Sequence, residues 1–212
     1  MDSNKTTLWV FGDSHTAGHG CTPYFEYYQK YYKEGDKTWP EHLSQYLDAD
    51  LINMGKNGAS NDFILDNIME SFDDIRSGDI VIIGKTYSNR FDIEIDNKFC
   101  TIFWDWSALV GPMDKELLTN EQIETLTNFQ YHFMDSPLFD KRWDKRFEWI
   151  KGLLENRGCK VIVWDVRKEL KVAEIIKVAT KGKIDDSHMS FQGHKDFFIH
   201  MWNKWFKDKT LL

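Results

Sequence analysis

The sequence is poor in cysteine and has no long apolar run, and each absence excludes a class of protein. Its three cysteines, Cys21, Cys100 and Cys159, are widely spaced and form no CxxC pair, so we expect neither a disulfide framework nor a cysteine-based zinc site. No stretch approaches eighteen consecutive apolar residues, which argues against a membrane-spanning helix. The first residues lack the charged-then-apolar order of a signal peptide. These features favour a cytoplasmic protein with reduced thiols, and they are compatible with a virus-particle protein that is made in a cytoplasm.

An excess of positive charge is also absent. The formal net charge is −7, which argues against a general nucleic-acid-binding protein. Hydrophobic residues make up 42% of the 212 residues, with nine tryptophans, and this composition excludes a disordered chain. We expect residues 1–212 to form a single domain, with an irregular, aromatic-rich insertion at about 91–136. The sequence does not indicate an oligomeric state.

The remaining pattern alternates short apolar runs with segments of helical periodicity. Such alternation predicts an α/β fold, in which a parallel sheet is covered by helices on both faces. The run at 79–84 is β-branched throughout and ends in glycine, as expected of a central strand. The expected strands are 8–11, 50–53, 79–84 and 160–165, and the expected helices are 39–47, 61–75, about 120–133, 143–156 and 191–206.

Polar, glycine-bearing segments follow three of these strands. They are Gly12-Asp13-Ser14, the segment 53–58 and the segment 84–90. Ligands of parallel α/β sheets bind at the carboxyl ends of the strands. The three segments are therefore predicted to meet at one edge of the sheet and to form a site there.

Residues 11–18 read FGDSHTAG, and they favour a serine nucleophile mounted at a strand end over a simple turn. A serine nucleophile needs a base within hydrogen-bond reach, and the base needs a partner that orients it. His188 is the candidate base because Asp185 precedes it by three residues, a spacing that lets a carboxylate fold back onto the imidazole. Asp186 is the alternative orienting group, and Asp185 is preferred.

A metal site is not predicted. His15 and His19 are four residues apart, as on one face of a helix, but the glutamate of an HExxH motif is absent and no second ligand pair has zinc spacing. FGDSHTAG also lacks the lysine and the glycine density of a phosphate-binding P-loop.

Three blocks of the sequence together resemble the SGNH, or GDSL, hydrolases. FGDSHTAG resembles the family's first block, which carries the nucleophile, here Ser14. The segment NMGKNGASN at 53–61 resembles the second block, in which a glycine N–H, here that of Gly58, helps to form the oxyanion hole. DDSHMSFQGH at 185–194 resembles the last block, with His188 and Asp185 completing the triad. The resemblance implies a flavodoxin-like three-layer α/β/α sandwich with a central parallel sheet, and hydrolysis of esters, thioesters or amides, including O-acetyl groups on sugars.

One block departs from the family pattern. The family's third block is Gly-x-Asn-Asp, and its Asn donates to the oxyanion, whereas Thr86 stands at that position here. Asn89 is the alternative donor if its side chain folds back. Arg90 and His15 are predicted to contact the substrate. Asp13 is assigned either to the substrate or, preferably, to holding the nucleophile turn.

The sequence therefore predicts a serine esterase that needs no cofactor. Its expected substrate is a small-molecule or glycan ester with an O-acetyl or other short acyl group. The alternative is a non-catalytic binding or structural module that keeps the fold but has a degraded oxyanion hole. Loss of one oxyanion donor costs about 100-fold in rate or more, so Thr86 bears on efficiency more than on the type of chemistry.

Overall fold

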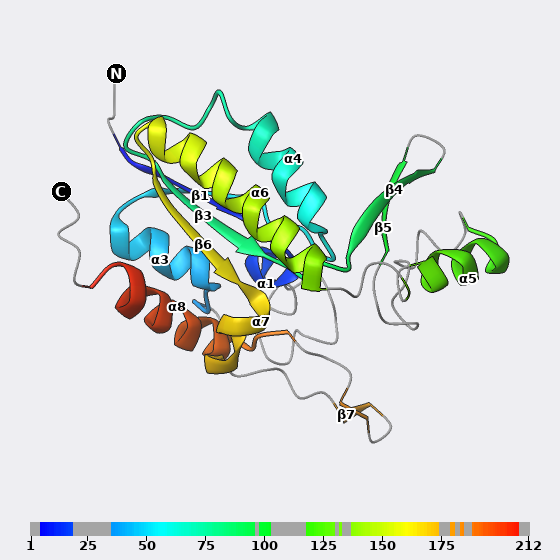
Figure 1. Cartoon of the computed structure of the whole chain (residues 1–212). Coiled ribbons are helices and arrows are strands. Elements are labelled where there is room, and N and C mark those ends of the chain that lie inside the picture. Colours follow the sequence, from blue (N-terminus) through cyan, green and yellow to red (C-terminus); the bar gives the residue numbers. More distant parts are fainter. Residues whose placement is uncertain are drawn as a thin grey trace.

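A four-stranded parallel sheet forms the centre of the molecule (Figure 1). The computed structural model describes residues 5–18, 35–95, 98–102, 118–129, 132, 137–173, 179–180, 183–184 and 188–207. The strands lie in the order β2-β1-β3-β6, and each pair of neighbours is parallel. The strands are β1 (Thr7–Phe11), β2 (Asp50–Asn53), β3 (Ile80–Lys85) and β6 (Lys160–Asp165).

β3 lies between β1 and β6 and is buried along its whole length. Its run of β-branched residues suits this position, because a strand inside a parallel sheet has helices over both faces. The register pairs Val81 of β3 with Trp9 of β1 and with Val161 of β6. The expectation of a central strand at this position is confirmed.

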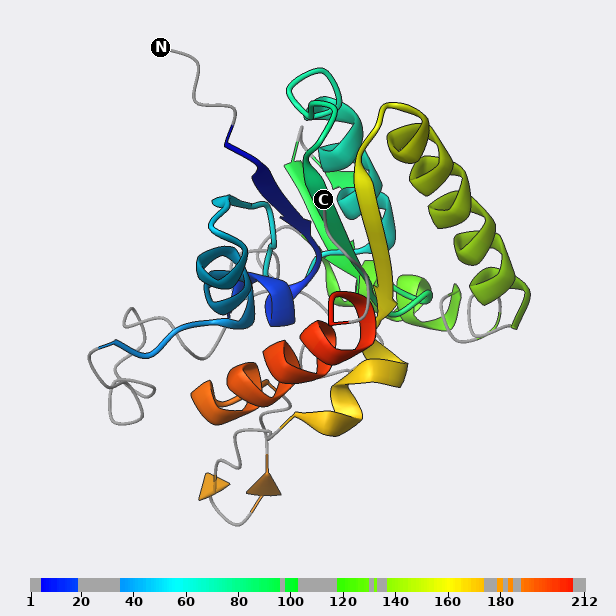
Figure 2. The same cartoon turned by 90° about the vertical axis from the view of Figure 1, so that its left-hand side faces the viewer.

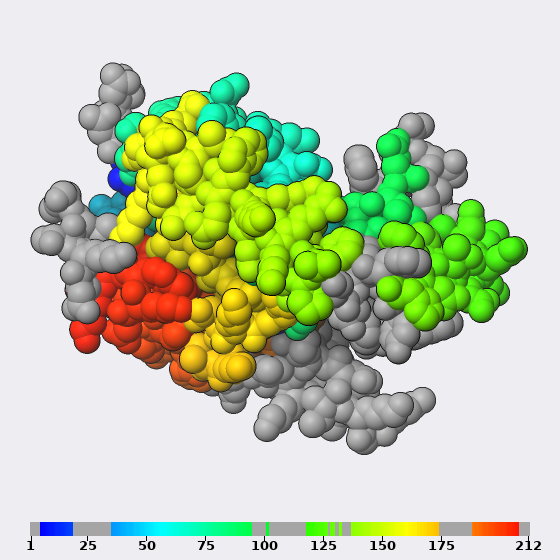
Figure 3. All heavy atoms as spheres, viewed as in Figure 1, coloured from blue at the N-terminus to red at the C-terminus, as the bar shows by residue number. Residues whose placement is uncertain are grey.

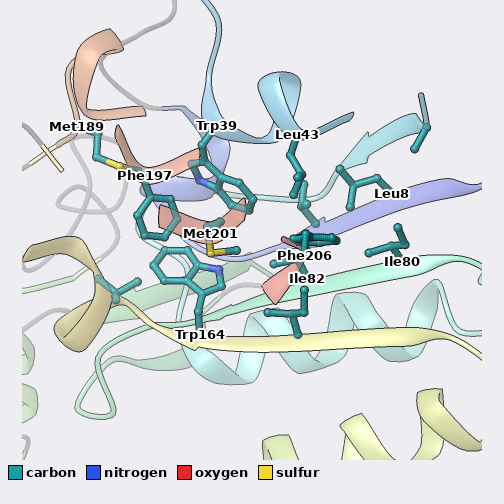
Figure 4. Packing of buried hydrophobic residues seen from close by; sticks show 14 residues of the cluster. Leu8, Trp39, Leu43, Ile80, Ile82, Trp164, Met189, Phe197, Met201 and Phe206 are labelled. Carbon is teal, nitrogen blue, oxygen red and sulfur yellow. The ribbon is translucent and has the colours of Figure 1, made fainter. Parts of the chain in front are cut away.

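Helices cover both faces of the sheet, so the molecule has three layers (Figure 2). On one face, α3 packs against α8, and alternate side chains of the strands meet them in a core that includes Leu8, Ile82 and Trp164 (Figure 4). The opposite strand residues pack against α4 and α6. The predicted α/β/α arrangement with a central parallel sheet is therefore confirmed. These helices are α3 (Trp39–Leu47), α8 (Phe191–Trp205), α4 (Asn61–Glu70) and α6 (Pro137–Asn156).

The boundaries of α4 and α6 differ most from the sequence expectation. α4 ends at Glu70 and turns follow it, although Ile75 remains fully buried in the same core. α6 begins at Pro137, six residues before the expected start at Trp143. Proline is well tolerated in a first helical turn, because the N–H that it lacks would have no partner within the helix there.

The insertion contains more regular structure than the sequence indicated. β4 (Phe91–Ile95) and β5 (Lys98–Ile102) form an antiparallel hairpin, and α5 (Asn120–Phe129) follows within the expected helical region. Leu118, Ile123 and Leu126 pack with Phe91 and Ile93 in a small apolar cluster of their own. In Figure 3 this part projects to one side of the body formed by the sheet and its helices. That the whole chain forms one domain stays a prediction.

Short elements complete the described structure. α1 (Ser14–Ala17) is separated from β1 by Gly12 and Asp13. α7 (Val166–Glu169) follows β6 directly, and a 3-10 turn at Leu170–Val172 comes after it. β7 (Ala179–Thr180) and β8 (Lys183–Ile184) form a minimal antiparallel pair. Within the described residues, no helix is both long enough and apolar enough to cross a membrane.

Candidate active site

The short helix α1 lies at the carboxyl end of β1 (Figure 1), and Ser14 comes two residues after Gly12, at which the chain leaves the strand. Ser14 is the first residue of α1 and is 6% exposed. Asp13 caps this short helix, because its Oδ1 accepts the backbone N–H of His15 at 3.1 Å. A Cβ at Gly12 would lie 2.2 Å from Oγ1 of Thr16, so the close turn from strand to helix requires glycine there. The local sequence thus places Ser14 near a strand end.

The segment after β2 is attached to this turn. The backbone N–H of Lys56 donates to the carbonyl of Gly12 at 3.0 Å, and the side-chain amide of Asn53 donates to the carbonyl of Thr16 at 2.9 Å. A Cβ on Gly55 would lie 2.5 Å from the backbone nitrogen of Ala17, which leaves no room for a side chain. Gly58, the predicted oxyanion donor, is half-buried and has a left-handed φ of 73°. Glycine adopts this conformation without the steric cost that other residues incur.

Asp13 and Arg90 join the three polar segments. Oδ2 of Asp13 accepts from Oγ1 of Thr86 at 2.8 Å and from Nη1 of Arg90 at 3.2 Å. The same Nη1 contacts the carbonyl of Ala59 at 3.3 Å and Oγ1 of Thr86 at 2.8 Å. The predicted meeting of the segments at one edge is therefore confirmed by direct hydrogen bonds.

This arrangement bears on three of the predicted site residues. Asp13 is fully buried and both of its oxygens accept hydrogen bonds from the protein, so the geometry favours its structural role over contact with a substrate. Thr86 is also fully buried, and its single hydroxyl hydrogen is directed at Asp13. The Arg90 side chain is 16% exposed, and its guanidinium also lies 4.9 Å from the ring centroid of Tyr87.

The remaining candidate in the third segment is Asn89. It is half-buried and lies in a turn in which the N–H of Arg90 donates to the carbonyl of Tyr87 at 3.2 Å. The backbone of Thr86 is held by Asn61, whose Oδ1 accepts the Thr86 N–H at 2.9 Å. The roles of Thr86 and Asn89 toward an oxyanion stay predictions.

His188 comes to this site from the other end of the chain. Its ring and that of His15 have centroids 5.3 Å apart and planes inclined by 35°. His188 is half-buried and precedes Met189, which is buried in the core beneath α3 and α8. The predicted base therefore lies beside the residue that follows the predicted nucleophile. Asp185 and Asp186, the two candidates for orienting His188, lie outside the described residues, as does His19.

His194 is a further histidine near the site, and the sequence did not assign it a role there. It is fully buried on α8, and its Nδ1 accepts the backbone N–H of Trp39 at 3.2 Å. Burial, with His15, His42 and His188 in the vicinity, lowers the pKa of His194 to about 3. The ring is therefore neutral at any pH near 7 and can keep Nδ1 as an acceptor.

A cluster of ion pairs holds the segment 84–90, which follows β3, against α6 and α7. Lys85, at the end of β3, is buried and donates to Asp144 and, at 3.0 Å, to Asp165. Burial opposes the charge of Lys85, but these hydrogen bonds and the two carboxylates outweigh it and raise the lysine pKa. Arg167 binds Asp140 at 2.9 Å, and Asp140 accepts from Ser88. The cluster thereby connects the segment after β3 to α6 and α7.

The described residues contain no group of three His, Cys, Asp or Glu side chains arranged to hold a metal ion. The site is instead built from a hydroxyl, imidazoles and an internally paired carboxylate and guanidinium.

The chain resembles solved structures of SGNH and G-D-S-L proteins at low identity. A lipolytic protein of the G-D-S-L family from Veillonella parvula shares 15% identity with a TM-score of 0.41, over 95% of this chain and 99% of that one. AlinE4, an SGNH-hydrolase family esterase, shares 17% identity with a TM-score of 0.33, over 96% of each chain. No protein-family model and no curated protein matches the sequence. Likeness at this level carries no conclusion about activity.

Proposed function

We propose that the protein is a serine hydrolase that cleaves carboxylic esters of small molecules or glycans, with O-acetyl or other short acyl groups as the preferred class. The observation that carries the proposal is the contact between His188 and His15, because it puts an imidazole from the C-terminal part of the chain beside the Ser14 turn. The proposal pairs this imidazole with the hydroxyl of Ser14, because nucleophilic acyl transfer needs a hydroxyl with a base within reach.

In the proposed reaction, His188 removes the proton of Ser14, and Oγ attacks the ester carbonyl carbon. The N–H groups of Ser14 and Gly58 stabilise the oxyanion. Asn89 is the further donor, or Thr86 once its hydroxyl turns away from Asp13. His188 then protonates the leaving alcohol as the ester C–O bond breaks. Water, deprotonated by His188, releases the acyl group as a carboxylic acid and restores the Ser14 hydroxyl. Asp185 is proposed to orient His188 throughout. The reaction needs no cofactor.

The test compares wild type with Ser14→Ala and His188→Ala, using p-nitrophenyl acetate hydrolysis and labelling by a fluorophosphonate. We expect both variants to lose at least about 1,000-fold in kcat, since removing a triad member abolishes most of the chemical acceleration. Ser44→Ala is the matched control, because Ser44 lies on α3 and, among the described residues, its hydroxyl donates locally to the carbonyl of Glu41. Asp185→Asn and Asp186→Asn, assayed separately, distinguish the two orienting candidates.

A non-catalytic binding module is the second candidate, and the hydrogen bond from Thr86 to Asp13 favours it. That bond uses the single hydroxyl hydrogen of Thr86, which stands where SGNH hydrolases have an oxyanion donor. Equal inertness of wild type and Ser14→Ala toward esters and fluorophosphonate would support the binding module and overturn the hydrolase. Labelling of wild type alone would exclude the binding module.

A further inference from the structure

From inside the core, Trp39 contacts the neighbours of both members of the proposed catalytic pair, namely His15 beside Ser14 and His194 on the helix after His188. Its indole Nε1–H donates to the backbone carbonyl of His15 at 3.0 Å, within the turn that carries Ser14. Its backbone N–H donates to Nδ1 of His194 at 3.2 Å, on the helix that follows His188. The residue is fully buried, so both hydrogen bonds are shielded from water.

The N-terminal cap of α8 joins His194 to His188. Ser190, two residues after His188, caps α8 by accepting the N–H of Gly193 at 3.0 Å, and its carbonyl accepts the N–H of His194 at 2.8 Å. Met189, between His188 and the cap, packs in the same core as Trp39 (Figure 4). A shift of α8 relative to Trp39 would therefore carry His188 with it.

The Trp39 ring is itself held in place by aromatic contacts. It meets Phe197 edge-on at 5.6 Å between centroids and Trp164 at 6.0 Å (Figure 4). Such contacts fix the direction of the indole N–H. Because Nδ1 of His194 receives the Trp39 N–H, the neutral imidazole is the form that suits this bond.

We propose that Trp39, acting with His194, is a positioning residue that holds the His188 segment in register with the Ser14 turn. The inference rests on the proposed hydrolase function. It explains how Ser14 and His188, which are separated by most of the chain, stay close enough for proton transfer. Misplacement of a catalytic group by about 1 Å can cost about 100-fold in rate, so two buried hydrogen bonds at this junction have a direct kinetic effect.

The main variant is Trp39→Phe, which keeps an aromatic ring but removes the indole N–H. We expect kcat for p-nitrophenyl acetate to fall by about 10- to 100-fold, with KM changed by less than about twofold, because geometry rather than binding is altered. Trp164→Phe is the matched control. It removes an indole N–H from the same core, and among the described residues that N–H has no hydrogen-bond partner. Because phenylalanine keeps an aromatic ring against Trp39, the kcat of Trp164→Phe is expected to stay within about threefold of wild type.

His194 provides a second pair that does not depend on Trp39→Phe folding. In His194→Asn, the side-chain oxygen takes the place of Nδ1 and can still accept the Trp39 N–H, whereas His194→Leu cannot accept it. We expect the Asn variant to keep kcat within about threefold and the Leu variant to lose about tenfold or more. Thermal midpoints of all four variants show whether a loss of kcat merely follows a loss of stability.

A readout independent of activity separates this inference from the proposed function. With ring-labelled histidine, the contact between the His15 and His188 imidazoles should give a nuclear Overhauser effect in wild type and in Trp164→Phe, and a weaker one in Trp39→Phe. If wild type is inert but only Trp39→Phe loses this signal, the positioning role is supported and the hydrolase function fails. If wild type is active and Trp39→Phe retains both kcat and the signal, the positioning role is overturned.

Discussion

The ion pair between Arg90 and Asp13 should contribute a large part of the stability of the site. Asp13 is fully buried, and Arg90 is the cationic partner found for it among the described residues. Replacement of Arg90 by methionine keeps much of the side-chain length but leaves a buried carboxylate without its cation. Breaking such a pair costs about 3 kcal/mol or more, because the remaining charge loses its compensation while it stays out of water.

Arg146→Met is the matched control for this substitution. Arg146 pairs with Asp62 at 3.3 Å, but the two side chains are 38% and 44% exposed. Exposed pairs contribute about 1 kcal/mol or less, because solvent screens them. Urea unfolding at pH 7 with a shared m-value should therefore show a loss for Arg90→Met at least about 2 kcal/mol greater than for Arg146→Met.

A double-mutant cycle tests whether the pair itself is the cause. In Asp13→Asn, the side-chain oxygen can still cap α1 through the N–H of His15, but the new amide faces the donors of Arg90. We expect Asp13→Asn to cost about 2 kcal/mol alone, and the double variant to cost about 1 kcal/mol less than the sum of the single losses. Strict additivity, or an Arg90→Met loss no larger than that of Arg146→Met, would refute this account.

Two further predictions concern the nucleophile turn and the buried histidine. Gly55→Ala should lower kcat about tenfold or more and destabilise the protein, since the new Cβ would lie 2.5 Å from the backbone nitrogen of Ala17. Apart from the nearby backbone of α6 itself, no atom of the described residues lies within 4 Å of a Cβ added at Gly152. Gly152→Ala should therefore leave kcat unchanged and add about 0.5–1 kcal/mol of helix stability. The same urea and p-nitrophenyl acetate assays check both glycine variants, and equal kcat values would contradict the prediction for Gly55→Ala. Burial lowers the pKa of His194 from 6.5 to about 3. Between these two pH values the unfolded chain therefore binds one more proton than the folded protein. The contribution of His194 to the free energy of unfolding is complete above pH 6.5 and is lost as the pH falls toward 3. His194→Asn should therefore show a shallower fall in the free energy of unfolding between pH 6.5 and pH 4 than wild type, and parallel curves for the two proteins would count against a buried neutral histidine.

The strands and the helices packed directly on the sheet could be predicted because burial imposes a visible period on the sequence. β6, for example, matches the expected range 160–165, and α3 matches 39–47. The hairpin of β4 and β5 was missed, although FDIEI at 91–95 alternates apolar and acidic residues with the period of a half-buried strand. The aromatic residues that follow it obscured this short signal.

The site was only partly predictable, because its contacts join residues far apart in the chain. Residue types and strand-end positions indicated Ser14, His188 and the three converging segments. They did not indicate that Arg90 is paired with Asp13, or that the hydroxyl hydrogen of Thr86 is already engaged. Nor did any local pattern indicate Lys85 between two carboxylates, since Asp144 and Asp165 reach it from α6 and β6.

The amino-acid sequence by itself determined the α/β class, the central strand and the order of the candidate catalytic blocks. Each of these depends on short-range periodicity, turn chemistry and residue type. Only the tertiary structure decided that His188 lies against His15, and that Trp39 joins the nucleophile turn to a histidine 155 residues further along. The physical reason is that such contacts arise where two helices packed on one face of the sheet meet a turn at its carboxyl edge, and that packing leaves no local trace in the sequence.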